Sequence, residues 1–305
     1  MIGQVPDGFT EVSLFSIIPR KLGSLVTALA LLLPATAVAQ GQTYDLRHDW
    51  RIDISVTVAA TTTWILSGVF EDRLMRKDCG WCERDSHGKS TVNGLDSAVR
   101  DGLKWSNSKT ADTASNVLNQ GVMPVTVLGM TALAAHHEGR VRDVPLDVLL
   151  ILEATTLALN VNQLTKMAVG RERPLVHALP PEQRSLTDNP SDNNASFYSG
   201  HTTRVFALAV ATGTVASLRG YRWAPWVWAA GLTVATSVGY LRIAADKHYF
   251  SDVLVGMVMG SGFGFAVPYL FHGRVSNDGE QGPPRLTLAL PCSNHQAMLL
   301  ARYAW

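Results

Sequence analysis

Six apolar stretches, each close in length to a membrane-crossing helix, constrain the fold of this 305-residue chain most strongly. A helix needs roughly 20 mainly apolar residues to cross the hydrocarbon core of a bilayer. None of the stretches shows the two-residue alternation that marks a half-buried strand. They cover residues 54–70, 117–135, 145–164, 203–218, 225–241 and 253–271. We therefore expect an all-α fold, a helical bundle of about six core helices, embedded in a membrane or packed as a helical core.

The composition favours the membrane alternative. Charged residues make up 17% of the chain and apolar residues 47%, whereas soluble proteins carry about 25% charged residues. A soluble periplasmic helical domain is the alternative. The net charge of +1 gives no reason to expect a nucleic-acid partner.

Residues 1–39 have the pattern of an export signal or an N-terminal anchor. The basic pair Arg20 and Lys21 precedes a short apolar segment at 22–33, and residues 37–39 have the small-x-small pattern of a cleavage site. A cleaved signal is the favoured interpretation, and an uncleaved anchor is the alternative.

Two of the three cysteines form a C-x-x-C pair, Cys79 and Cys82, inside a polar segment at 71–120. A structural zinc site needs four ligands, and the chain holds no second pair of this kind. In an exported protein a local disulfide is the better interpretation. Cys292 has no evident partner.

The chain divides into three parts after residue 39. Residues 40–121 form an N-terminal region that includes the C-x-x-C segment, residues 122–273 form the core, and residues 274–305 form a tail. No internal repeat is visible.

The connecting segments differ in character. Residues 95–105 carry apolar side chains with the spacing of an amphipathic helix. Residues 171–194 are rich in Pro, Asp and Asn, as loops are. In the tail, residues 286–290 and 298–305 are expected to form short strands or a loose extension.

Three motifs in the second half of the chain lie where apolar stretches begin or end. They are K-x6-R-P, from Lys166 to Pro174; S-G-H, from Ser199 to His201; and R-x5-H-x3-D, from Arg242 to Asp252. If the helices alternate in direction, all three motifs meet at one end of the bundle.

Together these residues have the properties of an anion site. Three cations at helix ends, Lys166, Arg173 and Arg242, suit the oxygens of a phosphoryl group. The S-G-H motif opens a helix, where unpaired backbone N–H groups point at an anion. Ser199 is a good N-cap or a hydroxyl donor, and Gly200 lets the backbone come close to the anion.

The two histidines supply the chemistry. His248 and Asp252 are four residues apart and share one helix face. A carboxylate bonded to one ring nitrogen fixes the tautomer and leaves the other nitrogen free to attack phosphorus. His201, across the pocket, is then the acid that protonates the leaving oxygen.

These motifs resemble the signature of the type 2 phosphatidic acid phosphatase and vanadium haloperoxidase superfamily, over residues 145–273. The resemblance implies that Lys166, Arg173, Ser199, Gly200 and Arg242 bind phosphate. It implies that His248 is the nucleophile, His201 the acid and Asp252 the partner of His248. Two positions depart from the usual pattern. Tyr198 replaces a proline and Leu241 replaces a serine, which affects loop shape rather than chemistry.

We therefore expect an acid phosphatase or lipid phosphate phosphatase that acts through a phosphohistidine and needs no metal cofactor, because the cations do the charge work. The substrate is a phosphorylated lipid or a small phosphate ester. Two rivals are a vanadium-dependent haloperoxidase, with vanadate in the same pocket, and a non-catalytic envelope scaffold.

The polar residues also have plainer interpretations. His248 and Asp252 can be a surface pair on a helix, and the three cations can flank membrane helices. The three motifs in order argue against both. Glu153 and Asn160, inside the third apolar stretch, are expected to be polar groups of the core rather than of the pocket.

The distribution of arginines predicts the orientation in the membrane. Arg140 and Arg142 lie in one loop, and Arg219 and Arg222 in another. The positive-inside rule puts both loops in the cytoplasm, so the active site faces the periplasm from a bacterial inner membrane. If all six stretches cross, residues 41–53 are cytoplasmic, which conflicts with a cleaved signal.

Overall fold

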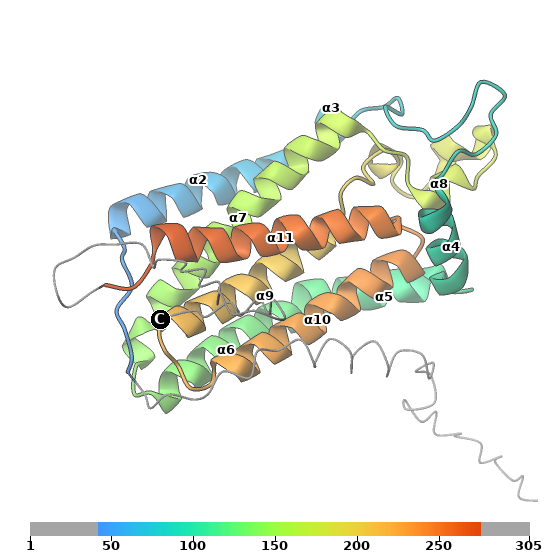
Figure 1. The fold of residues 1–305 in the computed structure, drawn as a ribbon. Coiled ribbons are helices and arrows are strands. Elements are labelled where there is room, and N and C mark those ends of the chain that lie inside the picture. The colour runs from blue at the N-terminus through green and yellow to red at the C-terminus, as the bar shows by residue number, and fades with distance from the viewer. Residues whose placement is uncertain (1–41, 276–305) are drawn as a thin grey trace, which may run out of the picture. The chain divides into compact units, whose positions relative to one another are not determined.

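The computed structural model describes residues 42–275, and every regular element in this range is a helix (Figure 1). The elements are α2 (Trp50–Val69), α3 (Glu71–Leu74), α4 (Gly94–Leu103), α5 (Ser108–Val117), η2 (Leu118–Val122), α6 (Met123–His137), η3 (Val141–Asp143), α7 (Val144–Val169), α8 (Pro174–His177), η4 (Pro181–Leu186), η5 (Pro190–Asp192), α9 (Gly200–Leu218), α10 (Ala224–Ala244) and α11 (Phe250–Phe271). The all-α expectation is confirmed. The expected signal at 1–39, Cys292 and the tail segments at 286–290 and 298–305 lie outside the described residues.

Each of the six apolar stretches corresponds to a long helix, but the second helix begins earlier than its hydropathy predicts. Helices α5, η2 and α6 follow one another without a break over Ser108–His137, whereas the apolar stretch begins at 117. Asn107 starts the segment because its side chain accepts a hydrogen bond from the Thr110 backbone N–H. The first turns are polar because they contribute side chains to the cavity end of the bundle, as described below.

Helix α9 is the centre of the bundle and contacts α6, α7, α10 and α11 (Figure 1). Nearly all of its side chains after His201 are buried. Two of its threonines donate their hydroxyls to carbonyls of the preceding turn, Thr203 to Ser199 O at 2.7 Å and Thr212 to Leu208 O at 2.6 Å. A helix enclosed on all sides thus tolerates polar side chains that satisfy themselves locally.

A row of glycines brings α11 close to α9. A Cβ atom on Gly256 would lie 2.8 Å from Ser199 O. A Cβ atom on Gly260 would lie 2.4 Å from Thr203 O, and one on Gly264 would lie 2.7 Å from Ala207 O. Such small-residue seams let two helix backbones approach closely. This contact fixes where α11 begins relative to the start of α9, and therefore where the second and third motifs meet.

Five helices are long and apolar enough to cross a membrane: α2, the α5–α6 segment, the α7 segment, α10 and α11. Their outward faces expose large apolar side chains, including Val125 at 71% and Val58 at 57%. In α2 only 11% of the most apolar stretch is buried. Because contiguous apolar surface of this extent is unfavourable in water, these faces require lipid, and the chain is a membrane protein.

The two ends of the bundle have different contents. Helix α7 ends at Gly170, a left-handed residue with φ of 62°, and this end also holds the start of α9, the end of α10 and the start of α11. The other end holds the loops before α7 and after α9. Residues 44–47 join this second end, because Tyr44 N–H donates to Arg219 O and Arg47 N–H to Gly273 O, both at 3.0 Å.

Candidate active site

All three motifs meet at a cavity of about 600 Å³ at the first of these ends. Six of the eight predicted catalytic and phosphate-binding residues line it: Lys166, Arg173, Gly200, His201, Arg242 and His248. Ser199 and Asp252 lie directly behind this lining and are fully buried.

His248 lies in the turn between α10 and α11 and is 2% exposed. Its Nδ1 is 2.8 Å from the carbonyl oxygen of Ser196, which only accepts hydrogen bonds, so Nδ1 carries the proton. Nε2 is then the unprotonated nitrogen, and it accepts a hydrogen bond from Nη1 of Arg173 at 3.3 Å. Burial, and then the nearby cations led by Arg173, hold the pKa of His248 well below its usual 6.5. The imidazole is therefore neutral, as a nucleophile must be.

Asp252 does not make the hydrogen bond that the sequence predicts. Its Oδ2 is 3.8 Å from His248 Nδ1, and the Ser196 carbonyl takes its place. The cause is local, because Asp252 is in the first turn of α11 and its carboxylate caps that helix by accepting from Tyr249 N–H at 2.9 Å. Asp252 also accepts from Ser196 Oγ and Arg171 Nη1, both at 2.6 Å. Asp252 and His248 are therefore linked through Ser196, whose hydroxyl donates to Asp252 and whose carbonyl accepts from His248.

Two of the three cations are held by carboxylates and the third is not. Arg173 donates to Asp192 Oδ1 at 2.5 Å, and Arg242 donates to Asp112 Oδ1 at 2.6 Å. Within residues 42–275, the side chain of Lys166 makes no hydrogen bond or ion pair, and it lies at the cavity. An unpaired ammonium beside two oriented guanidinium groups gives the cavity an excess of positive charge.

The S-G-H motif forms the floor of the cavity. Ser199 is the N-cap of α9, with its hydroxyl accepting from Thr202 N–H, and it is buried rather than aimed into the cavity. A Cβ at Gly200 would lie 3.0 Å from Asn162 Oδ1 and 3.4 Å from Lys166 Nζ. Glycine therefore keeps open the space in front of the lysine and the first N–H groups of α9.

His201 lies one residue further into α9 and is held by the polar first turns of the α5–α6 segment. Its Nε2 is 2.8 Å from Asn116 Oδ1. Because that oxygen only accepts, Nε2 carries a proton. Both histidines thus line one cavity, each with one ring nitrogen fixed by an oxygen acceptor.

Sequence reasoning missed Arg171, which organises the region behind the cavity. It is fully buried and donates to Glu83, Asp96 and Asp252 at 2.8, 2.9 and 2.6 Å. Its guanidinium also lies 4.2 Å from the ring centres of Trp81 and Tyr249. The only available signal was a second arginine two residues before Arg173. Its three carboxylate partners are 75 to 88 positions away along the chain and carry no recognisable motif.

Sequence reasoning also missed the carboxylates that hold two cations of the cavity. Asp112 precedes the second apolar stretch, and Asp192 lies in the segment expected to be a loop. Burial raises the pKa of Asp192, but Arg173 and Lys166 outweigh it and leave the pKa below its ordinary value. Asp192 is therefore an anion within the cavity, beside the cation that a phosphoryl group would bind.

The C-x-x-C segment contacts the end of α7. Cys79 and Cys82 form a disulfide in the structure. Between them, Gly80 N–H donates to Gly170 O at 2.9 Å. The predicted amphipathic helix at 95–105 corresponds to α4. Neither Glu153 nor Asn160 lines the cavity.

Comparisons with known proteins place these observations in a family. The PAP2 superfamily model matches residues 147–276. Over 83 residues the chain is 32% identical to phospholipid phosphatase 2 of Bos taurus, which is 26% of this chain and 29% of that protein. Over 65 residues it is 42% identical to lipid A 1-phosphatase of Porphyromonas gingivalis, which is 21% of this chain and 14% of that protein. The chain thus matches less than a third of the length of these relatives.

A solved structure of a transmembrane PAP2-type phosphatidylglycerolphosphate phosphatase from Bacillus subtilis is also similar. It covers 70% of this chain and 93% of that chain, with a TM-score of 0.42 and 16% identity. The segment matched by the family model contains all three motifs and both histidines of the cavity. The resemblance expected from the motifs is confirmed, because residues 147–276 match the PAP2 superfamily model.

Proposed function

We propose that the protein is a phosphatase that removes the phosphoryl group from phosphorylated lipids through a phosphohistidine at His248. The observation that carries the proposal is the position of the neutral His248 imidazole. Its unprotonated Nε2 accepts a hydrogen bond from Arg173 in a cavity that also holds Lys166, Arg242 and His201.

The reaction follows from these positions in two steps. The phosphoryl oxygens replace water against the three cations, and His248 Nε2 attacks phosphorus in line with the leaving oxygen. His201 takes up a proton from solvent when the phosphoryl dianion binds, and as the P–N bond forms and the P–O bond breaks it gives that proton to the leaving oxygen. A water molecule, deprotonated by His201, then attacks phosphorus. The P–N bond breaks, and inorganic phosphate and neutral His248 are released.

Charge stabilisation in this scheme comes from side chains. Two arginines and a lysine spread their charge over the equatorial oxygens, as metal ions do at other phosphoryl-transfer sites. We therefore propose that phosphoryl transfer needs no metal cofactor.

The walls of the cavity favour a lipid over a small soluble ester. Trp64, Ile65 and Val69 of α2, with Leu159 of α7, form an apolar side above the charged floor. The opposite face of α2 is exposed on the lipid-facing surface of the bundle. A lipid whose phosphate headgroup lies at the floor would therefore extend its acyl chains along α2 into the bilayer. The relatives named above also act on lipid phosphates, as their names state.

We further propose that the cavity faces the periplasm of a bacterial inner membrane. Arg142 and Arg222 are exposed at the opposite end, as the positive-inside rule requires of a cytoplasmic face. Arg219 does not contribute to this signal, because it is buried and paired with Asp147 at 2.7 Å. In this orientation residues 44–49 are cytoplasmic, whereas a cleaved signal predicts them outside. The orientation is tested with the variant Gln42→Cys and a membrane-impermeant thiol reagent. A cytoplasmic residue 42 should be labelled in opened cells and not in intact cells.

The activity is tested with the full chain in detergent. The substrates are a short-chain phosphatidic acid and an aryl phosphate. Phosphate release is measured in the first minutes after the protein is mixed with substrate and EDTA. Wild type is expected to hydrolyse both, and His248→Ala neither. The control is His87→Ala, an exposed histidine outside the cavity. Bromide oxidation that requires added vanadate, without phosphate release, would instead show the haloperoxidase activity.

A further inference from the structure

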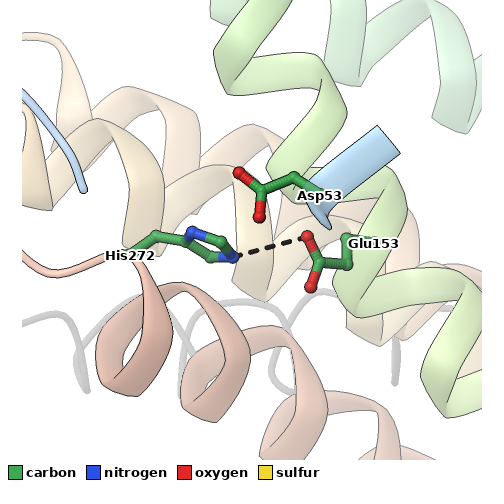
Figure 2. A group of neighbouring side chains, drawn as sticks. All are labelled: Asp53, Glu153 and His272. Atoms are coloured by element: carbon green, nitrogen blue, oxygen red, sulfur yellow. Dashed lines mark ion pairs between the residues drawn. The ribbon is translucent and has the colours of Figure 1, made fainter. Parts of the chain in front are cut away.

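A second cluster of ionisable side chains lies far from the cavity along the bundle (Figure 2). Asp53 comes from the first turns of α2, Glu153 from α7, and His272 directly follows α11. Figure 2 shows the three side chains pointing toward one another. Their ligand atoms all lie within 4.8 Å of one another, and each residue is more than nine-tenths buried. The proposed reaction does not use them.

The cluster lacks a fixed counter-charge. Two buried carboxylates at this distance are costly unless a cation lies between them. Within residues 42–275, no arginine or lysine forms an ion pair with Asp53 or Glu153. The guanidinium of Arg47, at the same end of the bundle, donates to Leu270 O at 3.2 Å instead.

The imidazole of His272 is oriented as a ligand. Its Nδ1 lies 3.1 Å from Arg47 O, a carbonyl that only accepts, so Nδ1 carries the proton. Its Nε2 forms an ion pair with Glu153 Oε2 at 3.4 Å, and within residues 42–275 neither of these two buried atoms has a hydrogen-bond partner. Metal-bound histidines characteristically donate their other ring N–H to a carbonyl or carboxylate in this way.

We propose that Asp53, Glu153 and His272 bind one divalent cation of the zinc type. Bonds of about 2.1 Å in a tetrahedral site place neighbouring ligand atoms about 3.4 Å apart, which matches the separation of His272 Nε2 and Glu153 Oε2. An imidazole among the ligands favours Zn²⁺ over Mg²⁺ and Ca²⁺. The two carboxylates neutralise its charge, and water completes the fourth position.

The cation has a structural role, because it ties the start of α2 to the bundle. The buried residues of α2 are Asp53, Thr57 and Ala60, and its main packing partner is α7. Apart from the cluster, one hydrogen bond crosses this contact, from Asn160 Nδ2 to Ala60 O at 2.8 Å. Further along, α2 forms the apolar wall of the cavity. The cation therefore fixes the helix that carries the wall, and takes no part in phosphoryl transfer.

The test uses the full chain in detergent, freed of metal by dialysis against EDTA and then given one equivalent of Zn²⁺. After desalting, bound zinc is counted by mass spectrometry and the unfolding midpoint is measured. Wild type is expected to retain one zinc per chain and to unfold at a higher temperature than the metal-free protein. Asp53→Asn and Glu153→Gln keep the side-chain volume. We expect each to weaken Zn²⁺ binding by about 100-fold or more, since even outer-shell partners contribute 10- to 100-fold. Glu182→Gln, an exposed residue, is the matched control.

Two results would overturn the proposal. The first is wild type that retains no more zinc than the double variant Asp53→Asn, Glu153→Gln; a proton on His272 Nε2 would then balance the cluster. The second is an X-ray absorption spectrum of the zinc-loaded wild type that shows no imidazole bound to zinc. This measurement does not depend on whether any variant folds. Both readouts are independent of phosphate release, so they stand whether or not the proposed phosphatase activity is found.

Discussion

Gly260 offers a sharp test of how α11 positions the third motif. A Cβ on this residue would lie 2.4 Å from Thr203 O and 3.1 Å from Ala207 N, both backbone atoms of α9. Ordinary contacts begin at 3.4 Å, so Gly260→Ala requires α11 and α9 to separate by about 1 Å, since a close-packed interior has no free space to absorb it.

The expected magnitude combines two opposing effects. Overpacking of this kind costs about 1–3 kcal/mol, and the better helix propensity of alanine returns up to about 1 kcal/mol. Gly260→Ala should therefore lower the free energy of unfolding by about 1–2 kcal/mol. Because α11 begins two residues after His248, a shift of about 1 Å should also lower kcat by about 100-fold.

The assay compares thermal unfolding and kcat of Gly260→Ala with those of Gly262→Ala in the same detergent. A Cβ at Gly262 meets nothing within 4 Å, so this variant gains only helix propensity and should keep full activity. Equal stability and equal kcat in the two variants would refute the reasoning that the glycine seam sets the position of the site.

Three further predictions concern the charges around the cavity. Asp192→Asn removes an anion that competes with phosphate for Arg173. The inhibition constant for inorganic phosphate should therefore fall, by up to about tenfold. The control Asp188→Asn, at an exposed residue of the same loop, should leave this constant unchanged. Because burial and cations lower the pKa of His248, its neutral form persists below pH 6.5, and the acid limb of kcat/KM should lie below that pH. Lys166→Met removes one of those cations and should move this limb to higher pH; an unmoved limb would argue against His248 as its origin. Arg171→Met leaves three carboxylates without their cation and should cost about 3–5 kcal/mol of stability, seen as a lower unfolding midpoint, whereas the half-buried Arg184→Met should cost far less.

Much of the fold follows from the sequence because each membrane helix is a local pattern. The ends of the six apolar stretches carry the three motifs, and antiparallel packing then brings Lys166, Arg242 and His248 together. The start of the α5–α6 segment was missed because its first turns are polar. Asp112 and Asn116 there face Arg242 and His201, so the same residues that serve the cavity hide the helix from a hydropathy pattern.

The partners of the motif residues could not be predicted, because they depend on contacts between distant segments. The spacing of His248 and Asp252 allows a direct hydrogen bond, but a helix N-terminus also attracts an acidic side chain in its first turn, and the capping contact prevails. Arg171 shows the same limit, because nothing local indicates that its three carboxylates converge on it. Glu153 was recognised as a polar group of the core, but its neighbours Asp53 and His272 are each at least 100 positions away along the chain.

In the proposed reaction, His248 carries the phosphoryl group during turnover. Rapid acid-free quenching with an aryl phosphate, followed by peptide mass spectrometry, tests it directly. We predict a phosphoryl group on His248 that is stable to base and labile to acid, that forms before phosphate is released, and that is absent from His248→Ala. Turnover with no phosphorylated residue, or with the phosphoryl group on another side chain, would show that His248 is not the nucleophile.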